Sequence, residues 1–173
     1  VVCPHTKDEE VFVFGNPPYL GSRNQDADQK ADMHLIFNDR GKSLDYICCW
    51  FEKGNRFIHN YPKAKFAFVS TNSICQGEQV ALLWESILQN SEIAFAYKSF
   101  KWTNNAKYQA AVICVIIGVQ QKGTAKIKRL FSEENEEKVY NINPYLTSGP
   151  SLFFHRLSKP ISEGFQELRF GSM

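Results

Sequence analysis

The sequence lacks the features that mark membrane, secreted or metal-binding proteins. Its longest apolar run, residues 110–119, is far shorter than the ~20 residues that a membrane-spanning helix needs. The amino terminus does not show the charged, apolar and small-residue segments of a signal peptide. The five cysteines form no Cys-x-x-Cys pair, and the four histidines have no spacing that is typical of metal ligands. We therefore expect a cytoplasmic protein with reduced thiols, no membrane partner and no metal site.

Neither sign of charge dominates the chain. Twenty Lys and Arg residues against eighteen Asp and Glu residues give a formal charge of +2, which excludes a uniformly electropositive nucleic-acid wrapper but allows a local basic face. A hydrophobic fraction of 43% with 22% charged residues indicates a chain that folds around a core. There is no initiator Met, and a strand pattern begins within the first dozen residues, so we interpret the chain as part of a longer protein.

Two short apolar runs have the character of buried parallel strands. Residues 11–14 run into Gly15-Asn16-Pro17-Pro18, and residues 66–69 run into a polar turn at 70–73. Helical spacing follows each of them. The first helix is predicted to end near Gly54 and the second to start after Gly77; their apolar positions are Leu44, Ile47, Cys48 and Phe51 in the first, and Val80, Leu83, Trp84, Ile87 and Leu88 in the second. The alternation predicts an α/β fold, with residues 20–32 as a polar stretch between its elements.

Residues 93–100 and 110–119 are predicted to be two further strands. Because a short loop joins them, we expect them to pair antiparallel. Beyond residue 120 a basic segment and an acidic segment, residues 120–129 and 133–137, suggest an exposed hairpin or linker. We divide the chain into a partial catalytic domain, residues 1–120, and an irregular extension, residues 121–173, that leads toward a domain absent from this chain.

Asn16-Pro17-Pro18-Tyr19 is the strongest chemical signal, because ligands of open α/β sheets bind beyond the carboxyl ends of the strands. An amino group attached to a base, or an amide nitrogen, has a conjugated lone pair that must be freed before it attacks a methyl donor. The Asn16 side-chain oxygen and the Pro17 carbonyl can accept the hydrogens of such a group. Pro17 and Pro18 have a fixed φ and no N–H, so they hold the loop rigidly. Tyr19 offers a flat face for stacking a flipped base.

The motif with its surroundings resembles the S-adenosylmethionine-dependent adenine-N6 DNA methyltransferases, and within them the MmeI-like branch of single-chain (type IIG) restriction-modification enzymes. The resemblance spreads over most of the chain. The segments that carry it are Phe14-Gly15-Asn16-Pro17-Pro18-Tyr19, Leu20-Gly21-Ser22, Gln29-Lys30-Ala31-Asp32-Met33, Phe68-Val69-Ser70-Thr71-Asn72-Ser73-Ile74, Gln76-Gly77-Glu78-Gln79-Val80, Phe100-Lys101-Trp102-Thr103-Asn104-Asn105-Ala106 and Asn143-Pro144-Tyr145-Leu146.

The resemblance implies the second half of a Rossmann-like methyltransferase sheet, the carboxyl-terminal part of the methyltransferase domain, with a terminal antiparallel hairpin. S-adenosylmethionine is the implied cofactor, held in this chain by Gly15 and Asn16. No Gly-x-Gly is present, and the rest of the cofactor site is expected outside the chain, so we expect the chain alone to be inactive. The implied partners are double-stranded DNA with a flipped adenine and the rest of the parent polypeptide, including a target-recognition domain and, where the parent also cleaves DNA, a nuclease domain.

Phe100 and Trp102 are candidates for stacking on the face of the base opposite Tyr19, and ordinary core packing is an equal alternative for both. Strand alternation places the two on the same side of their strand. Two other functions stay open. One is methyl transfer to a protein glutamine or to an RNA guanine nitrogen, and the other is a DNA-interaction module without catalysis.

Overall fold

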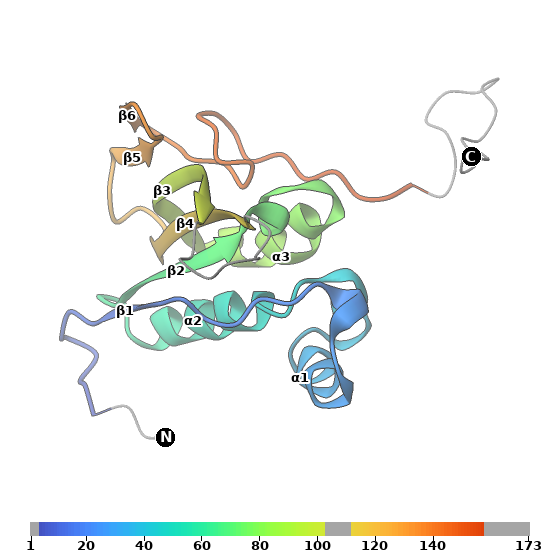
Figure 1. The fold of residues 1–173 in the computed structure, drawn as a ribbon. Coiled ribbons are helices and arrows are strands. Elements are labelled where there is room, and N and C mark those ends of the chain that lie inside the picture. The colour runs from blue at the N-terminus through green and yellow to red at the C-terminus, as the bar shows by residue number, and fades with distance from the viewer. Residues whose placement is uncertain (1–3, 103–111, 158–173) are drawn as a thin grey trace.

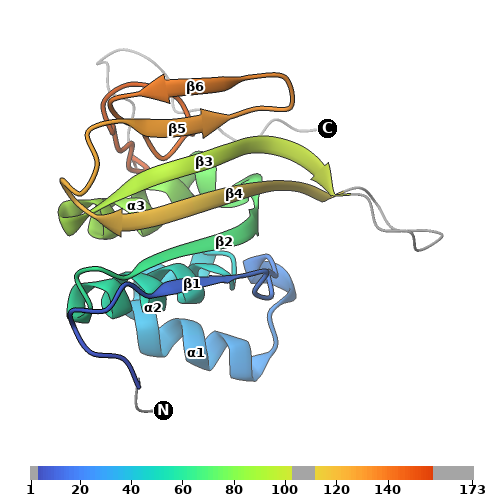
Figure 2. The same cartoon turned by 90° about the vertical axis from the view of Figure 1, so that its left-hand side faces the viewer.

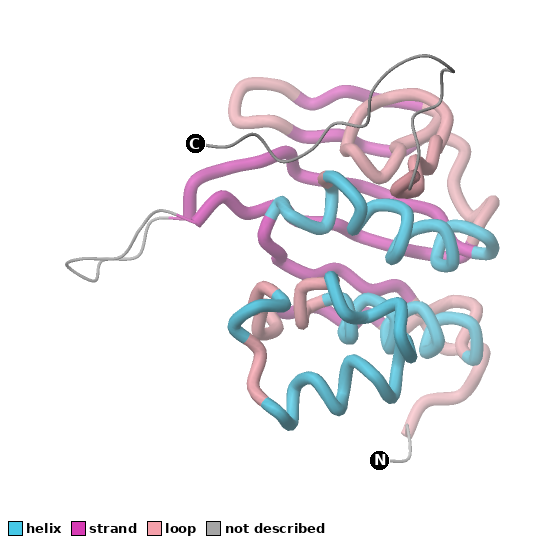
Figure 3. Tube along the Cα trace, turned by 90° about the vertical axis from the view of Figure 1, so that its right-hand side faces the viewer, coloured by secondary structure: helices cyan, strands magenta, loops and turns pink. Residues whose placement is uncertain are grey.

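A six-stranded mixed sheet carries all of its described α-helices on one face. The computed structural model describes residues 4–102 and 112–157. The strand order is β1-β2-β4-β3-β5-β6, which Figure 2 shows from bottom to top. The strands are β1 (Phe12–Gly15), β2 (Lys65–Thr71), β3 (Ser91–Trp102), β4 (Val112–Gln121), β5 (Lys128–Phe131) and β6 (Glu136–Val139), and the helices are α1 (Ala27–Phe37), α2 (Cys48–Asn60) and α3 (Gly77–Asn90). Figures 1 and 3 show the three helices together on one side of the sheet.

The predicted pairings of the first four strands are confirmed. β1 and β2 pair in parallel, while β3 and β4 pair antiparallel, and β4 lies between β2 and β3. Of the two alternatives beyond residue 120, an exposed hairpin or a linker, the hairpin forms as β5 and β6, and it joins the sheet because β5 pairs in parallel with β3. The sheet therefore continues past residue 120, while the division of the chain into two regions at that point stays a prediction.

The core lies between the sheet and the helices and is centred on aromatic rings. The Phe51 ring from α2 meets the rings of Phe66, Phe68 and Trp84 edge-on, with centroids 5.4–5.9 Å apart. Offset and edge-on arrangements of this kind suit the quadrupole of each ring. The buried Trp84 indole also donates a hydrogen bond to the Ile74 carbonyl at 2.9 Å. Helix α2 thus packs on β2 and β4, and α3 packs on β3.

The predicted bounds of the first helix were wrong at both ends. Leu44 is extended, and α2 runs from Cys48 to Asn60, with Gly54 in its buried middle. A Cβ atom on Gly54 would lie 3.0 Å from the Phe66 ring. Glycine therefore serves here for the close approach of helix and sheet, not as a helix end, and its lower helix propensity is outweighed by packing.

Helix α1 begins within residues 20–32, the stretch that we predicted only to be polar, and extends to Phe37. Few apolar residues mark it: Met33 and Phe37 are buried, while Leu35 is exposed. The available signal was at its amino terminus, where Asp26 accepts from the Gln29 N–H at 2.8 Å and the Gln29 side chain accepts from the Asp26 N–H at 3.1 Å. This reciprocal capping box satisfies two backbone donors and starts a helix without an amphipathic pattern.

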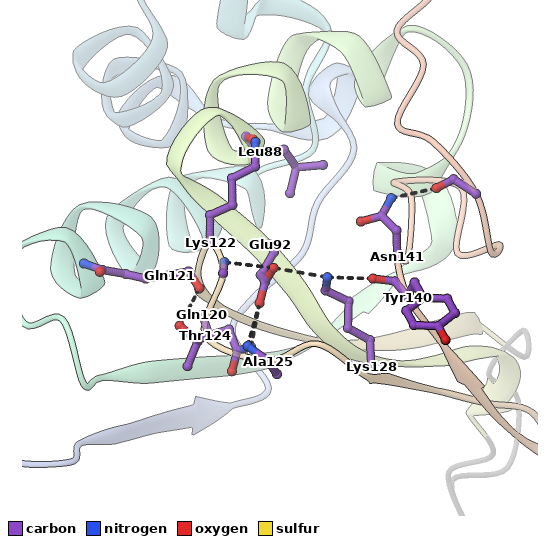
Figure 4. A network of polar contacts seen from close by, with 12 residues as sticks. Leu88, Glu92, Gln120, Gln121, Lys122, Thr124, Ala125, Lys128, Tyr140 and Asn141 are labelled. Carbon is purple, nitrogen blue, oxygen red and sulfur yellow. Dashed lines mark hydrogen bonds and ion pairs between the residues drawn. The ribbon is translucent and has the colours of Figure 1, made fainter.

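A buried polar network joins the start of β3 and the end of β4 to β5. Figure 4 shows it from close by. The Glu92 carboxylate in β3 accepts hydrogen bonds from the Gln120 side chain at 2.8 Å and from the N–H groups of Gly123 and Ala125 at 3.1 and 3.3 Å. Lys128 lies 3.1 Å from Glu92 and donates to the Tyr140 carbonyl at 2.9 Å. The network thus connects β3, β4, β5 and the segment that follows β6.

The outer edge of β1 predicts self-association of the 173-residue chain. Phe12 and Phe14 are 59% and 81% exposed, and the edge of β1 opposite β2 has no partner strand among the described residues. An open edge with apolar side chains is a template for pairing with another strand. We expect the weight-average mass in light scattering to rise with concentration. Lysine at both Phe12 and Phe14 should reduce the rise, and a concentration-independent monomer would contradict the prediction.

Candidate active site

The Asn16-Pro17-Pro18-Tyr19 loop begins where β1 ends. Gly15 is the last residue of the strand and pairs with Phe68, so Asn16 follows directly at the carboxyl end of the parallel pair, as the sequence predicted. Asn16 and Pro18 are exposed, while Pro17 is buried. Within the described part of the chain, nothing hydrogen-bonds the Asn16 carboxamide. Its oxygen and nitrogen therefore face solvent and can serve a ligand.

Tyr19 and Phe100 come together at a residue that the sequence did not single out for the site, Cys114. Cys114 in β4 is 0% exposed and lies opposite Thr71 of β2 on one side and Phe100 of β3 on the other. The half-buried Tyr19 donates a hydrogen bond from its hydroxyl to the Cys114 sulfur. The motif loop, β2, β3 and β4 therefore converge on one thiol at this end of the sheet.

Burial and the neighbouring Cys114 raise the pKa of Tyr19 above its ordinary value, so its phenol is neutral at physiological pH. Burial likewise raises the pKa of Cys114, although the hydrogen bond from Tyr19 opposes that shift. Both groups are therefore uncharged at pH 7. The neutral, flat ring of Tyr19 beside this neutral thiol is a surface on which an uncharged base can stack.

A bulge in β3 sets the direction of Phe100. The register with β4 shifts between Tyr97 and Phe100, and the two rings meet edge-on with centroids 5.4 Å apart. The extra residue keeps both aromatic side chains on the same face of the strand despite their odd spacing. Trp102 ends the strand opposite Val112, but its side chain and the loop of residues 103–107 lie outside the described residues.

The residue after Tyr19 is fixed at both of its backbone groups. The Leu20 N–H donates to Asp45 Oδ1 at 2.9 Å, and the Leu20 carbonyl accepts from the Gln25 side chain and from the Tyr46 N–H, both at 3.0 Å. Gln25 and Asp45 are buried. Neither was predicted, since a Gln in a loop and an Asp before a helix have no spacing that points to the motif.

The remaining buried cysteines take no part in this arrangement. Burial raises the pKa of Cys49 to about 11 and raises those of Cys48 and Cys75 as well, so their thiols stay protonated. Cys49 packs against the Met33 sulfur at 3.2 Å and joins α1 to α2. Cys48, Cys49, Cys75 and Cys114 are free and buried, and the first three of them pack in the hydrophobic core.

Metal clusters and membrane spans are both missing from the described residues. No group of three or more His, Cys, Asp or Glu side chains among them could hold a metal ion. No helix in that part of the chain has the length and apolar character needed to cross a bilayer.

The end of β1 has room for part of a bound cofactor. A Cβ atom on Gly15 would meet no atom within 4 Å, so the space beside this backbone is open. Asn16 next to it carries an unengaged carboxamide. These two residues fit one edge of a polar ligand, and the described chain adds no glycine-rich turn of the Gly-x-Gly type.

Comparison with known proteins shows which proteins are similar to the chain over most of its length. The family described as "MmeI, DNA-methyltransferase domain" matches residues 1–132. The chain is 50% identical over 175 residues to DNA methyltransferase A of Bacillus subtilis (strain 168), an alignment that covers 99% of this chain and 20% of that protein. It is also similar to the structure of the Type IIL restriction-modification enzyme MmeI in complex with DNA, with a TM-score of 0.82 and 39% identity over 88% of this chain and 22% of the other.

The chain thus spans about a fifth of the length of these relatives. Its mixed α/β sheet with three helices is the fold of the MmeI methyltransferase, as the sequence predicted. The family match covers most of the chain and includes the motif at the end of β1. The chain belongs to the MmeI DNA-methyltransferase domain family.

Proposed function

We propose that the protein containing this chain transfers a methyl group from S-adenosylmethionine to the exocyclic N6 of adenine in a specific DNA sequence, as part of a restriction-modification enzyme. The observation that carries the proposal is the exposed, unengaged Asn16 at the end of β1, near Tyr19, which hydrogen-bonds Cys114, and near Phe100, which pairs with Cys114 across β3 and β4. The family membership of the chain supports methyl transfer to DNA.

The residues of the loop divide the work. The Asn16 side-chain oxygen and the Pro17 carbonyl accept the two hydrogens of the adenine amino group and free its lone pair. The buried Pro17 and the exposed Pro18 fix the loop, and the Tyr19 ring stacks on the flipped base, with Phe100 and Trp102 as candidates for its other face. When bound, S-adenosylmethionine supplies an electrophilic methyl group. The nitrogen would attack the methyl carbon in line while the carbon–sulfur bond breaks and the sulfur leaves as a neutral thioether, and the surplus proton on the nitrogen would pass to solvent afterwards.

Gly15 and Asn16 hold one edge of the cofactor in this proposal, and the other contacts come from outside the chain. The open space beside Gly15 supports this division of the site. For the same reason we expect the 173-residue chain alone to transfer no methyl group. Double-stranded DNA, the remainder of the cofactor site and a target-recognition domain are the partners that the proposal requires.

The test is transfer of radiolabelled methyl from S-adenosylmethionine by the complete polypeptide to genomic DNA, total RNA and cell protein. Nucleoside digestion should place the label on N6-methyladenine alone. Synthetic duplexes in which purine, which lacks the 6-amino group, replaces the target adenine should accept no label. Label on guanine of RNA or on glutamine would replace the proposal by one of the alternatives, and DNA binding without any label would favour a module without catalysis.

A further inference from the structure

We propose that Asp45 is a positioning residue for the methyl-transfer loop, acting through the backbone of Leu20. The inference rests on the proposed function, because it assigns Asp45 a part in the same site. Asp45 is 5% exposed and lies on the segment just before α2. Helix α1 and its connecting segments separate Asp45 from the motif along the chain. The chain path brings its carboxylate back to the residue that follows Tyr19.

The Asp45 carboxylate accepts hydrogen bonds from two backbone N–H groups. Its Oδ1 accepts from the Leu20 N–H at 2.9 Å and from the Ile47 N–H at 3.2 Å. Among the described residues, no Lys, Arg or His lies within ion-pair distance of it. A buried carboxylate without a cation is costly unless hydrogen bonds compensate it. The two amide donors, one of them from the residue that follows the motif, are the hydrogen bonds that compensate the burial of this carboxyl group.

The same segment ties the loop to the helical layer on two further sides. The Asp45 N–H donates to the Gln79 side chain of α3 at 3.1 Å. The Tyr46 hydroxyl donates to the Asp32 carboxylate of α1 at 2.7 Å, which raises the pKa of Tyr46 to about 12. The neighbouring Tyr46 N–H and the Gln25 side chain hold the Leu20 carbonyl. The Leu20 peptide groups are thus fixed relative to α1, α2 and α3 together.

The consequence concerns Tyr19, whose main-chain carbon and carbonyl precede the Leu20 nitrogen directly. Fixing that nitrogen fixes the direction in which the chain leaves Tyr19, and so helps to place the Tyr19 side chain against Cys114. Methyl transfer needs the amino nitrogen placed in line with the donor, and displacement of about 1 Å costs on the order of a hundredfold in rate. Asp45 does not touch the substrate in this account. It sets the geometry of residues that do.

The experiment compares three variants of the complete polypeptide. Asp45→Ala removes both hydrogen bonds, while Asp45→Asn keeps an acceptor oxygen. Asn55→Ala is the matched control, because Asn55 is a buried polar residue of the neighbouring α2 that accepts a hydrogen bond from Ser91 at 2.6 Å, away from the motif. We expect kcat of Asp45→Ala to fall about tenfold or more with KM for DNA little changed. Asp45→Asn should restore most of kcat, and Asn55→Ala should leave it unchanged.

A second readout does not depend on activity. Hydrogen–deuterium exchange of the Leu20 amide should become faster in Asp45→Ala but not in Asp45→Asn or Asn55→Ala. If the wild-type protein methylates no DNA, the proposed function fails while the exchange result still reports on the loop. Equal loss of kcat in Asp45→Ala and Asn55→Ala would overturn the positioning role. So would unchanged Leu20 exchange, or an Asp45→Asn variant as slow as Asp45→Ala.

Discussion

Replacing Lys128 with methionine is expected to lower the free energy of unfolding of the chain by about 3 kcal/mol. The Lys128 and Glu92 side chains are 7% and 9% exposed, and removing the ammonium leaves the carboxylate buried without its cation. The Tyr140 carbonyl loses its donor as well. Urea unfolding at low protein concentration, followed by tryptophan fluorescence, to which the buried Trp84 contributes, measures the change.

Lys98→Met is the matched control, because Lys98 pairs with Glu137 at the same 3.1 Å distance on the surface, with side chains 36% and 51% exposed. Exposed pairs contribute about 0–1 kcal/mol, so this variant should barely shift the midpoint. Adding Glu92→Gln to Lys128→Met should recover part of the loss, since the amide is neutral and can still accept hydrogen bonds. Equal midpoints for Lys128→Met and Lys98→Met would contradict the assignment.

The same network predicts acid sensitivity. Burial alone would raise the pKa of Glu92, but hydrogen bonds from Gln120, the Gly123 amide, Lys128 and the Ala125 amide outweigh it and lower the pKa. A lowered pKa means that the stabilisation is complete above the ordinary carboxyl pKa of about 4.3 and is lost as the pH falls through the lower value of the folded state. Glu92→Gln should therefore flatten the dependence of unfolding free energy on pH in this acidic range.

Asn16→Ala is expected to reduce kcat for DNA methylation by about 10²–10³-fold, the cost of removing one acceptor or donor aimed at the reacting group. Asn16 is exposed and makes no hydrogen bond within the described structure, so the protein should lose no stability. Single-turnover methylation by the complete polypeptide separates the chemical step from product release. Asn24→Ala changes an exposed Asn in the same connection and should leave the rate unchanged.

Asn16→Asp provides a further comparison. A carboxylate keeps acceptor oxygens at the same position, so part of the rate should return. A loss below tenfold in Asn16→Ala, or an Asn16→Asp variant no faster than Asn16→Ala, would show that the Asn16 oxygen does not hold the amino group.

The sequence predicted the elements whose apolar side chains are buried against one neighbour, the sheet or the helix layer. α3 and the pairs β1–β2 and β3–β4 follow from runs of β-branched and aromatic residues or from helical spacing, because the sheet alone buries them. α1 was missed, since its helix depends on the capping box of Asp26 and not on an apolar stripe. Gly54 was misread because the close approach of Phe66 is a tertiary contact that no local pattern carries.

For the candidate site, the sequence predicted the place of the motif and offered Phe100 as a candidate for base stacking, but it did not predict that Cys114 lies next to both. Cys114 has the same local appearance as Cys48, which is plain core. Its meeting with Tyr19 and Phe100 depends on β4 lying between β2 and β3, and on the bulge before Phe100. Asp45 reaches Leu20 through the fold of α1 and α2. The places of Cys114 and Asp45 next to the motif therefore depend on long-range contacts of the fold, which residue type alone does not predict.

The strand order has a consequence for how the chain folds during synthesis. β2 and β3 follow one another in sequence, yet they never pair, because β4 is placed between them and bonds to both. A nascent chain that has not yet exposed residues 112–121 to solvent outside the ribosome therefore holds two separate pieces, β1 with β2 and the still unpaired β3. Such late, non-local closure slows folding. Cys114 lies in β4, so the site is assembled when β4 joins β2 to β3, before β5 and β6 extend the sheet.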